Sequence, residues 1–158
     1  MLTTDTYTLR KATNQDGPRV WALISGVLAG YGIATNARTT DRDLADLEGN
    51  FAARGGAFFV LLDGATVIGT VALRRESAQA GELCRMYLLE KYRGQGLGRR
   101  LFDHALAEAR RRGFREVFLK TASVLTTAIS LYERAGFRPV PDQQAGGNCD
   151  RVMRMSLV

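Results

Sequence analysis

The sequence predicts a single α/β (α+β) domain built on a mixed, mostly antiparallel sheet. Two β-rich apolar runs joined by Asp63-Gly64 predict a hairpin, because this dipeptide favours a tight turn. A strand, helix and strand over residues 82–121 predict two parallel strands joined by a right-handed crossover. A chain of 158 residues suffices for one core and is too short for two ordinary domains. We therefore expect one domain over residues 1–158.

Upstream of the hairpin, the sequence predicts one strand and two helices. Residues 7–12 alternate apolar and polar side chains, as a half-buried strand does. From Asp16 onward, apolar residues recur every three or four positions, which favours an amphipathic helix. A glycine-bearing loop over 29–38 precedes a second helix, for which we expect Thr40 as the N-cap and Asp43 as the reciprocal acceptor.

The hairpin and the later elements follow from apolar runs that end at glycines. In chain order, the expected elements are strands at Ala57–Leu62, Thr66–Leu73 and Glu82–Leu89, a helix from Leu97 to Gly113, a strand at Glu116–Thr121, a helix from Val124 to Gly136, and a closing antiparallel pair at 137–140 and 150–158. The order is therefore β-α-α-β-β-β-α-β-α-β-β.

The composition limits the classes of ligand and the location of the protein. The net charge is +6 and the basic residues are mostly arginine, a group suited to phosphates. Because these residues are scattered and no groove-reading motif accompanies them, the sequence gives nucleic-acid binding little support. Cys84 and Cys149 lack the spacing of a metal site, so we expect no metal. The longest apolar run, residues 57–62, is too short to cross a membrane, so we expect a soluble cytoplasmic protein.

A glycine-rich turn, Arg93-Gly-Gln-Gly-Leu-Gly98, joins the strand before it to the helix after it. Glycines leave backbone N–H groups accessible, and a helix N-terminus favours negative charge, so the turn predicts a phosphate site. A Walker A loop is excluded because Arg99-Arg100 stand where it needs Lys and Ser or Thr. A dinucleotide fingerprint is excluded because neither glycine register gives G-x-G-x-x-G.

The pattern that remains is Arg-x-x-Gly-x-Gly, formed by Arg93, Gly96 and Gly98. With the element order and the Leu-Tyr-Glu-Arg-Ala-Gly-Phe segment at 131–137, it resembles the GCN5-related N-acetyltransferase (GNAT) superfamily over nearly the whole chain. The resemblance implies a six- or seven-stranded, mostly antiparallel sheet with a central parallel βαβ unit and about four helices. It also implies acetyl-CoA as co-substrate, with no metal.

The resemblance assigns two groups of residues to the cofactor. The pyrophosphate is expected on the turn, formed by Arg93, Gly94, Gln95, Gly96, Leu97 and Gly98, and Arg99 or Arg100 could reach the phosphates of the adenosine end. The pantetheine arm is expected to pair with Met86, Tyr87 and Leu88, where the strand parts from its parallel neighbour. Many members carry an asparagine where this chain has Leu125; Ser123 or Thr126 could replace its contact.

Acetyl transfer to an amine needs a base for the amine and an acid for the leaving thiolate. The resemblance places Tyr132 beside the thioester sulfur as the acid, whereas the helical pattern alone also suits a core aromatic. We choose Glu82 as the base, acting directly or through a water, although a strand-end glutamate is also an ordinary solvated residue. Asp150 or a chain of waters is the alternative base.

The acceptor is expected to be a primary amine of a small molecule or amino acid, acetylated by direct transfer in a ternary complex. Candidate residues lining the acceptor site are Tyr31, Asn36, Arg38, Arg74 and Arg85. If either of the last two arginines enters the site, a carboxylate-bearing acceptor is favoured over a polyamine. Two alternatives stay open, a catalytically silent acyl-CoA-binding regulatory domain and a basic nucleic-acid-binding module. A homodimer would be ordinary for the family.

Overall fold

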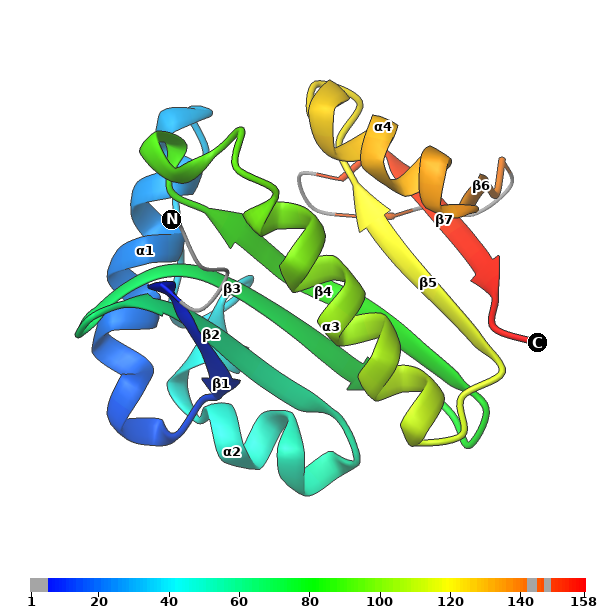
Figure 1. Cartoon of the computed structure of the whole chain (residues 1–158), viewed down its shortest axis with the longest axis horizontal. Helices are drawn as coiled ribbons and strands as arrows, with labels where there is room; N and C mark the ends of the chain where they lie inside the picture. Colours follow the sequence, from blue (N-terminus) through cyan, green and yellow to red (C-terminus); the bar gives the residue numbers. More distant parts are fainter. Residues whose placement is uncertain (1–5, 142–144, 147–148) are drawn as a thin grey trace.

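A computed structural model describes residues 6–141, 145–146 and 149–158, and its architecture centres on one seven-stranded sheet (Figure 1). The elements are β1 (Thr8–Lys11), α1 (Gly17–Gly30), α2 (Leu47–Asn50), β2 (Ala57–Asp63), β3 (Thr66–Arg75), β4 (Ala80–Leu88), α3 (Leu97–Arg111), β5 (Glu116–Thr121), α4 (Thr126–Ala135), β6 (Arg138–Pro139) and β7 (Arg151–Ser156). The strand order is β1-β2-β3-β4-β5-β7-β6, and β4–β5 is the parallel pair. The predicted mixed, mostly antiparallel sheet is confirmed.

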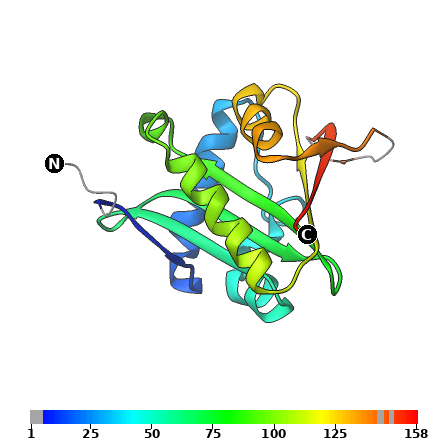
Figure 2. The ribbon, with the colours of Figure 1, turned by 45° about the vertical axis from the view of Figure 1, so that its right-hand side comes forward.

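Helices cover both faces of the sheet and create two hydrophobic cores. The core under α3 and α4 contains Phe59, Phe102 and Phe137, each at most 1% exposed. The core under α1 and α2 contains Ile24 and Phe51, which are completely buried. Figure 2 shows α3 lying along one face of the strands with α1 and α2 on the other. Within the described residues, no helix combines the length and the apolar character needed to cross a membrane.

The local sequence signals located most elements correctly. The turn between β2 and β3 contains Gly64 at a φ of +60°, a conformation that glycine adopts without strain. Helix α3 begins at Leu97, and β5 spans the predicted residues Glu116–Thr121. Pro139 forms part of the short strand β6, which pairs with β7 as the closing antiparallel pair.

The second predicted helix is the main correction. Instead of one helix capped by Thr40, the chain forms a 3-10 turn (Arg42–Ala45), the single-turn α2 and a second 3-10 turn (Ala52–Arg54). The N-cap of α2 is Asp46, whose carboxylate accepts a hydrogen bond from the Gly49 amide at 2.8 Å. The Thr40 hydroxyl donates to Asp41, and the Asp43 carboxylate binds arginines rather than capping the helix.

A bulge in β4 shapes the region where the sheet opens. Thr70 pairs with Tyr87 while Ala72 pairs with Cys84, so β4 has one residue more than β3 over this interval. Arg85 lies in the bulge at a φ of +51°, a left-handed conformation that is unfavourable for a residue with a side chain. Its carbonyl oxygen accepts a hydrogen bond from the Thr70 hydroxyl at 2.8 Å, which holds the bulge against β3.

The parallel strands β4 and β5 part soon after they pair. They are paired from Ala80 to Leu83 on β4, opposite Glu116 to Leu119 on β5, and β4 continues without β5 as far as Leu88 (Figure 1). The expected parting of the strands before the glycine turn is therefore present. Beyond Leu83, the edge of β4 that faces β5 presents backbone groups that β5 does not use.

Candidate active site

A pocket of about 470 Å³ occupies the region where β4 and β5 part. Residues of β3, β4, β5, α4 and the segment before α2 line it, so elements far apart in the sequence meet there. The lining includes Thr40, Asp41, Arg42, Asp43, Arg74, Glu82, Cys84, Arg85, Met86, Tyr87, Lys120, Leu125, Tyr132 and Cys149. The two predicted catalytic residues, Glu82 and Tyr132, thus lie on one pocket.

Tyr132 lies on α4 and is 7% exposed. Its ring packs against Phe102 and Phe137, with centroid separations of 5.8 and 6.0 Å. Burial raises the pKa of Tyr132 to about 12, so the phenol stays protonated at neutral pH. Among the described residues, its hydroxyl has no hydrogen-bond partner. The side chain therefore serves both as part of the core and as a protonated hydroxyl at the pocket.

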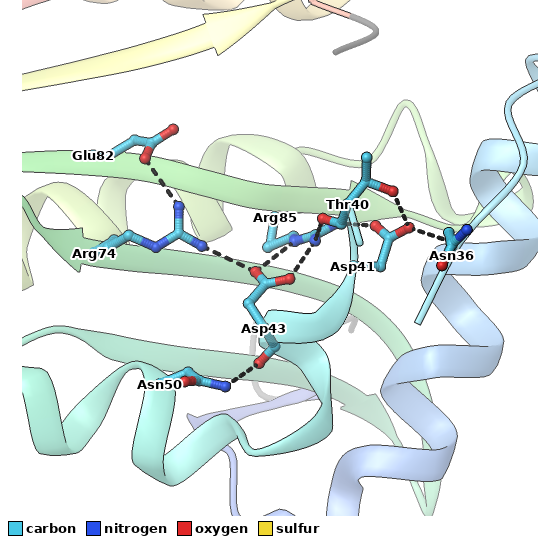
Figure 3. A network of polar contacts seen from close by, with 8 residues as sticks. All are labelled: Asn36, Thr40, Asp41, Asp43, Asn50, Arg74, Glu82 and Arg85. Atoms are coloured by element: carbon cyan, nitrogen blue, oxygen red, sulfur yellow. Dashed lines mark hydrogen bonds and ion pairs between the residues drawn. The ribbon is translucent and has the colours of Figure 1, made fainter. Parts of the chain in front are cut away.

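Glu82 is buried rather than solvated, at 6% exposure. Its carboxylate accepts a hydrogen bond from Arg74 on the neighbouring strand at 3.0 Å (Figure 3). Asp150, the alternative base, accepts hydrogen bonds from the Ser123 amide and hydroxyl at 2.8 and 3.0 Å. Asp150 is absent from the described residues that line the pocket, whereas Glu82 is one of them.

Arg74 and Arg85 reach the pocket, but both are engaged by carboxylates of the protein (Figure 3). Arg74 donates to Asp43 at 2.9 Å as well as to Glu82. Arg85 donates to Asp41 at 2.9 Å and to Asp43 at 2.6 Å, and also to the Thr40 carbonyl. Asp41, Asp43 and Glu82 therefore already pair with these two arginines, and the expectation that the arginines attract a carboxylate-bearing acceptor stays a prediction.

The pKa values within this group of charges reflect the pairing. Burial works against the charge of Arg85, but the hydrogen bonds and charge of Asp43 outweigh it and raise the pKa. Burial likewise disfavours the Asp41 carboxylate, yet hydrogen bonds from the Asn36 amide, Arg85 and Thr40 lower its pKa overall. Arg85 and Asp41 therefore stay ionised at neutral pH, and the ion pairs connect β3 and β4 with the segment before α2.

The other three acceptor candidates do not line this pocket in the described residues. Tyr31 is 46% exposed at the end of α1. Asn36 and Arg38 belong to a tight turn, in which the Asn36 side chain accepts from the Arg38 amide at 2.9 Å. The Asn36 amide donates to Asp41 at 2.8 Å, so this residue acts on the pocket through Asp41.

The turn between β4 and α3 has the backbone of an anion site. Gly94 and Gly96 have φ values of +81° and +82°, which a residue with a side chain adopts only with strain. Gly96 is the N-cap of α3 and provides no side-chain cap, so the first amides of the helix lack an intramolecular acceptor. A Cβ at Gly98 would meet only an ordinary contact, with Met86, so packing does not require glycine there.

The remaining cofactor candidates take different positions. Met86 and Tyr87 line the pocket, whereas Leu88 packs into the core under α3. Arg93 donates to the Leu88 carbonyl and Gln95 accepts from the Tyr7 hydroxyl, both at the solvent-exposed turn. Arg99 forms an exposed ion pair with Asp103 at 2.9 Å, so it would have to leave that pair to reach a phosphate.

Five residues that were not predicted to belong to the site also line the pocket: Asp41, Asp43, Lys120, Cys84 and Cys149. Burial raises the pKa of Cys84 to about 12 and also raises the pKa of Cys149. Both thiols are therefore protonated at neutral pH and poorly suited to form an acyl-enzyme. The described residues contain no cluster of His, Cys, Asp and Glu that could hold a metal ion.

Comparisons with known proteins agree with this geometry. Residues 34–137 match the model of the acetyltransferase (GNAT) family. An uncharacterized N-acetyltransferase of Escherichia coli, YjgM, is 32% identical over 154 residues, covering 93% of this chain and 92% of its own. A GNAT-family acetyltransferase from Staphylococcus aureus superposes with a TM-score of 0.87 at 18% identity, over 96% of this chain and 99% of its own.

A further structural neighbour holds a ligand. The putative acetyltransferase yncA of Salmonella typhimurium, solved with its cofactor acetyl-CoA, superposes with a TM-score of 0.76 at 23% identity. The alignment covers 97% of this chain and 95% of that one. Its likeness establishes the shared fold, while the family model and the E. coli relative establish the family. The chain therefore belongs to the GNAT family of acetyltransferases and is an acyltransferase enzyme.

Proposed function

We propose that this enzyme transfers the acetyl group of acetyl-CoA directly to the primary amine of a small molecule or amino acid, within a ternary complex. The observation that carries the proposal is the meeting of a buried carboxylate, Glu82, and a buried phenol, Tyr132, in one pocket at the parting of β4 and β5. Membership of the family supports acetyl-CoA as the donor.

The residues present are suited to holding that donor. The amides at the start of α3 and the open glycine turn would bind the pyrophosphate, and the free edge of β4 would pair with the pantetheine arm. When bound, the cofactor supplies an activated acetyl thioester. Met86 and Tyr87 lie where β4 lines the pocket, so the arm would lead from the turn towards Glu82 and Tyr132.

Glu82 and Tyr132 would handle the two protons of the reaction. Glu82, directly or through a water, would take a proton from the attacking amine, and Tyr132 would give one to the leaving sulfur. A pocket of about 470 Å³ would hold the amine against the thioester, and this positioning contributes to the rate besides the proton transfers. The protonated state of both cysteines supports direct transfer over an acyl-cysteine intermediate.

The proposal is tested by measuring thiol release from acetyl-CoA with amino acids, polyamines, aminoglycosides and peptide N-termini as acceptors. We expect acceptor-dependent release with at least one small amine or amino acid, and a mass increase of one acetyl group on its nitrogen. Calorimetry that shows acetyl-CoA binding, together with no release across the whole panel, would instead establish a silent acyl-CoA-binding domain.

Replacing Tyr132 by Phe is expected to lower kcat roughly 10²-fold. This is near the lower end of the rate losses seen when a general acid is removed, because a thiolate is already a moderate leaving group. Acetyl-CoA affinity and thermal stability should stay near the parent values, since the phenol has no described protein partner to lose. Steady-state kinetics and calorimetry measure these effects. Tyr92→Phe, which loses a hydrogen bond to Asp63 outside the pocket, is the control. An unchanged kcat over the full pH range would remove Tyr132 from the mechanism.

A further inference from the structure

The charged residues of the pocket fall into two groups that differ in their pairing. Among the described residues, seven charged side chains line the pocket: Asp41, Asp43, Glu82, Arg42, Arg74, Arg85 and Lys120. The three carboxylates pair with Arg74 and Arg85 in the network of Figure 3. Arg42 and Lys120 form no ion pair with any described residue. The two charged side chains of the pocket that lack an ion pair with a described residue are therefore both cations.

Lys120 lies on the same face of the sheet as Glu82. Leu83 and Leu119 are opposite each other in the β4–β5 register, and both are buried in the core under α3 and α4. Because successive residues of a strand point to opposite faces, Glu82 and Lys120 both point to the other face. Lys120 is also the first residue of β5 after its last pair with β4, so it stands where the pocket opens.

Lys120 is exposed to solvent and is also one of the residues that line the pocket. Its charge opposes the burial that raises the pKa of Cys149, another lining residue. The partner strand β7 places Val152 opposite Lys120 and so offers it no carboxylate at that position. Lys120 therefore supplies a cation on the same face of the sheet as Glu82. This cation forms no ion pair with a described residue.

We propose that Lys120 determines acceptor specificity by binding a carboxylate of the acceptor, so that the substrate is an amino acid whose amine is directed to Glu82. This inference rests on the proposed acetyl transfer. The free amino acid has a cationic and an anionic group, and the pocket offers a carboxylate and an ammonium group on one face. A polyamine would instead place a second cation near Lys120, where like charges repel. The substrate class therefore follows from Lys120 and not from Arg74 or Arg85.

The test compares acceptors that differ only in the carboxylate. The proteinogenic amino acids are screened, and the best of them is compared with its amide and its decarboxylated amine. The acid should have the lowest KM, and Lys120→Gln should raise that KM roughly tenfold, as expected for loss of one charge-assisted contact. The KM values of the amide and amine should stay within about twofold of the parent. Lys120→Arg keeps the charge and should restore most of the affinity for the acid.

Two further measurements separate specificity from stability and catalysis. Lys11→Gln removes an exposed lysine of β1, outside the pocket, and should leave every KM unchanged. Calorimetric titration of the amino acid into enzyme saturated with CoA should show the same loss of affinity in Lys120→Gln, with the affinity for acetyl-CoA unchanged. Melting temperatures of all three variants establish that the fold is retained.

The outcomes distinguish this inference from the proposed function. If the amide or a polyamine is acetylated as well as the acid, or if Lys120→Gln affects acid and amide equally, the role of Lys120 is wrong while acetyl transfer stands. If acetyl-CoA binds but no acceptor of any charge releases thiol, the proposed function fails, and the inference fails with it.

Discussion

Replacing Glu82 by Gln is expected to lower the rate of acetyl transfer roughly 10³-fold near pH 6 to 7, within the range typical of a lost general base. At these pH values an amine with a pKa near 10.4 is almost entirely protonated, so it needs the carboxylate most. The loss should shrink as the pH approaches the pKa of the amine, because more of the acceptor is then already neutral. Rate profiles over pH 6 to 10 with the best acceptor measure the effect.

The glutamine variant is a close structural match to the parent. Its side-chain oxygen still accepts a hydrogen bond from Arg74, which the parent carboxylate accepts at 3.0 Å. The control is Glu116→Gln on β5, whose side chain is 40% exposed and lies 3.9 Å from Arg154, and this variant should leave the profile unchanged. Acetyl-CoA affinity should be equal in all three proteins. If the Glu82→Gln and parent profiles coincide at every pH, the base is a chain of waters or another group.

The parts of the fold that the sequence predicted correctly depend on interactions between near neighbours in the chain. Asp63-Gly64 adopts a turn because its glycine takes a positive φ, and this needs no information from the rest of the protein. The glycine turn from Arg93 to Gly98 and the helix after it are local in the same sense. Tyr132 could be proposed for the pocket because its motif is local, although its catalytic role stays a prediction.

The parts that were missed depend on contacts between residues far apart in the sequence. Arg85 binds Asp41 and Asp43 across 44 and 42 residues, and no periodicity in the sequence reports such a pair. Arg74 and Arg85 bind the Asp43 carboxylate, which therefore does not cap a helix as predicted. The bulge at Arg85 shifts the alternation of β4, which places Leu83 and Met86 on the same core face three positions apart.

The ion pairs of Arg85 lead to the largest expected effect on stability. Replacing Arg85 by Ala should lower the free energy of unfolding by about 3 kcal/mol at pH 7, at the lower end for breaking a buried ion pair. The Arg85 side chain is 12% exposed and the Asp41 side chain 5%, so the variant leaves a buried carboxylate short of its cation. The expected loss of stability is at the lower end of that range because both carboxylates retain hydrogen bonds. Asp43 still accepts from Arg74, and Asp41 still accepts from the Asn36 amide and the Thr40 hydroxyl. Urea denaturation measures the difference.

Two comparisons separate the ion pairs from the strained backbone. Arg85→Gly removes the same ion pairs but tolerates the φ of +51°, so it should be about 1 kcal/mol more stable than Arg85→Ala. Arg154→Gln, which loses a long and exposed pair with Glu116, should cost less than about 1 kcal/mol. Equal stability of the alanine and glycine variants would show that the bulge relaxes when the arginine is lost.

The pH dependence of the stability difference between the parent and Arg85→Ala tests whether the carboxylates cause the loss. Because the pKa of Asp41 is lowered in the folded protein, its contribution to stability is present above the unfolded pKa of about 3.9 and is lost as the pH falls through the folded value. The difference between parent and Arg85→Ala should therefore be largest near neutral pH and should shrink below about pH 4. If the stability difference between the two proteins stays constant down to pH 2, the stability is lost through packing. The segment before α2 would then be held against β3 and β4 by apolar contacts instead of charge.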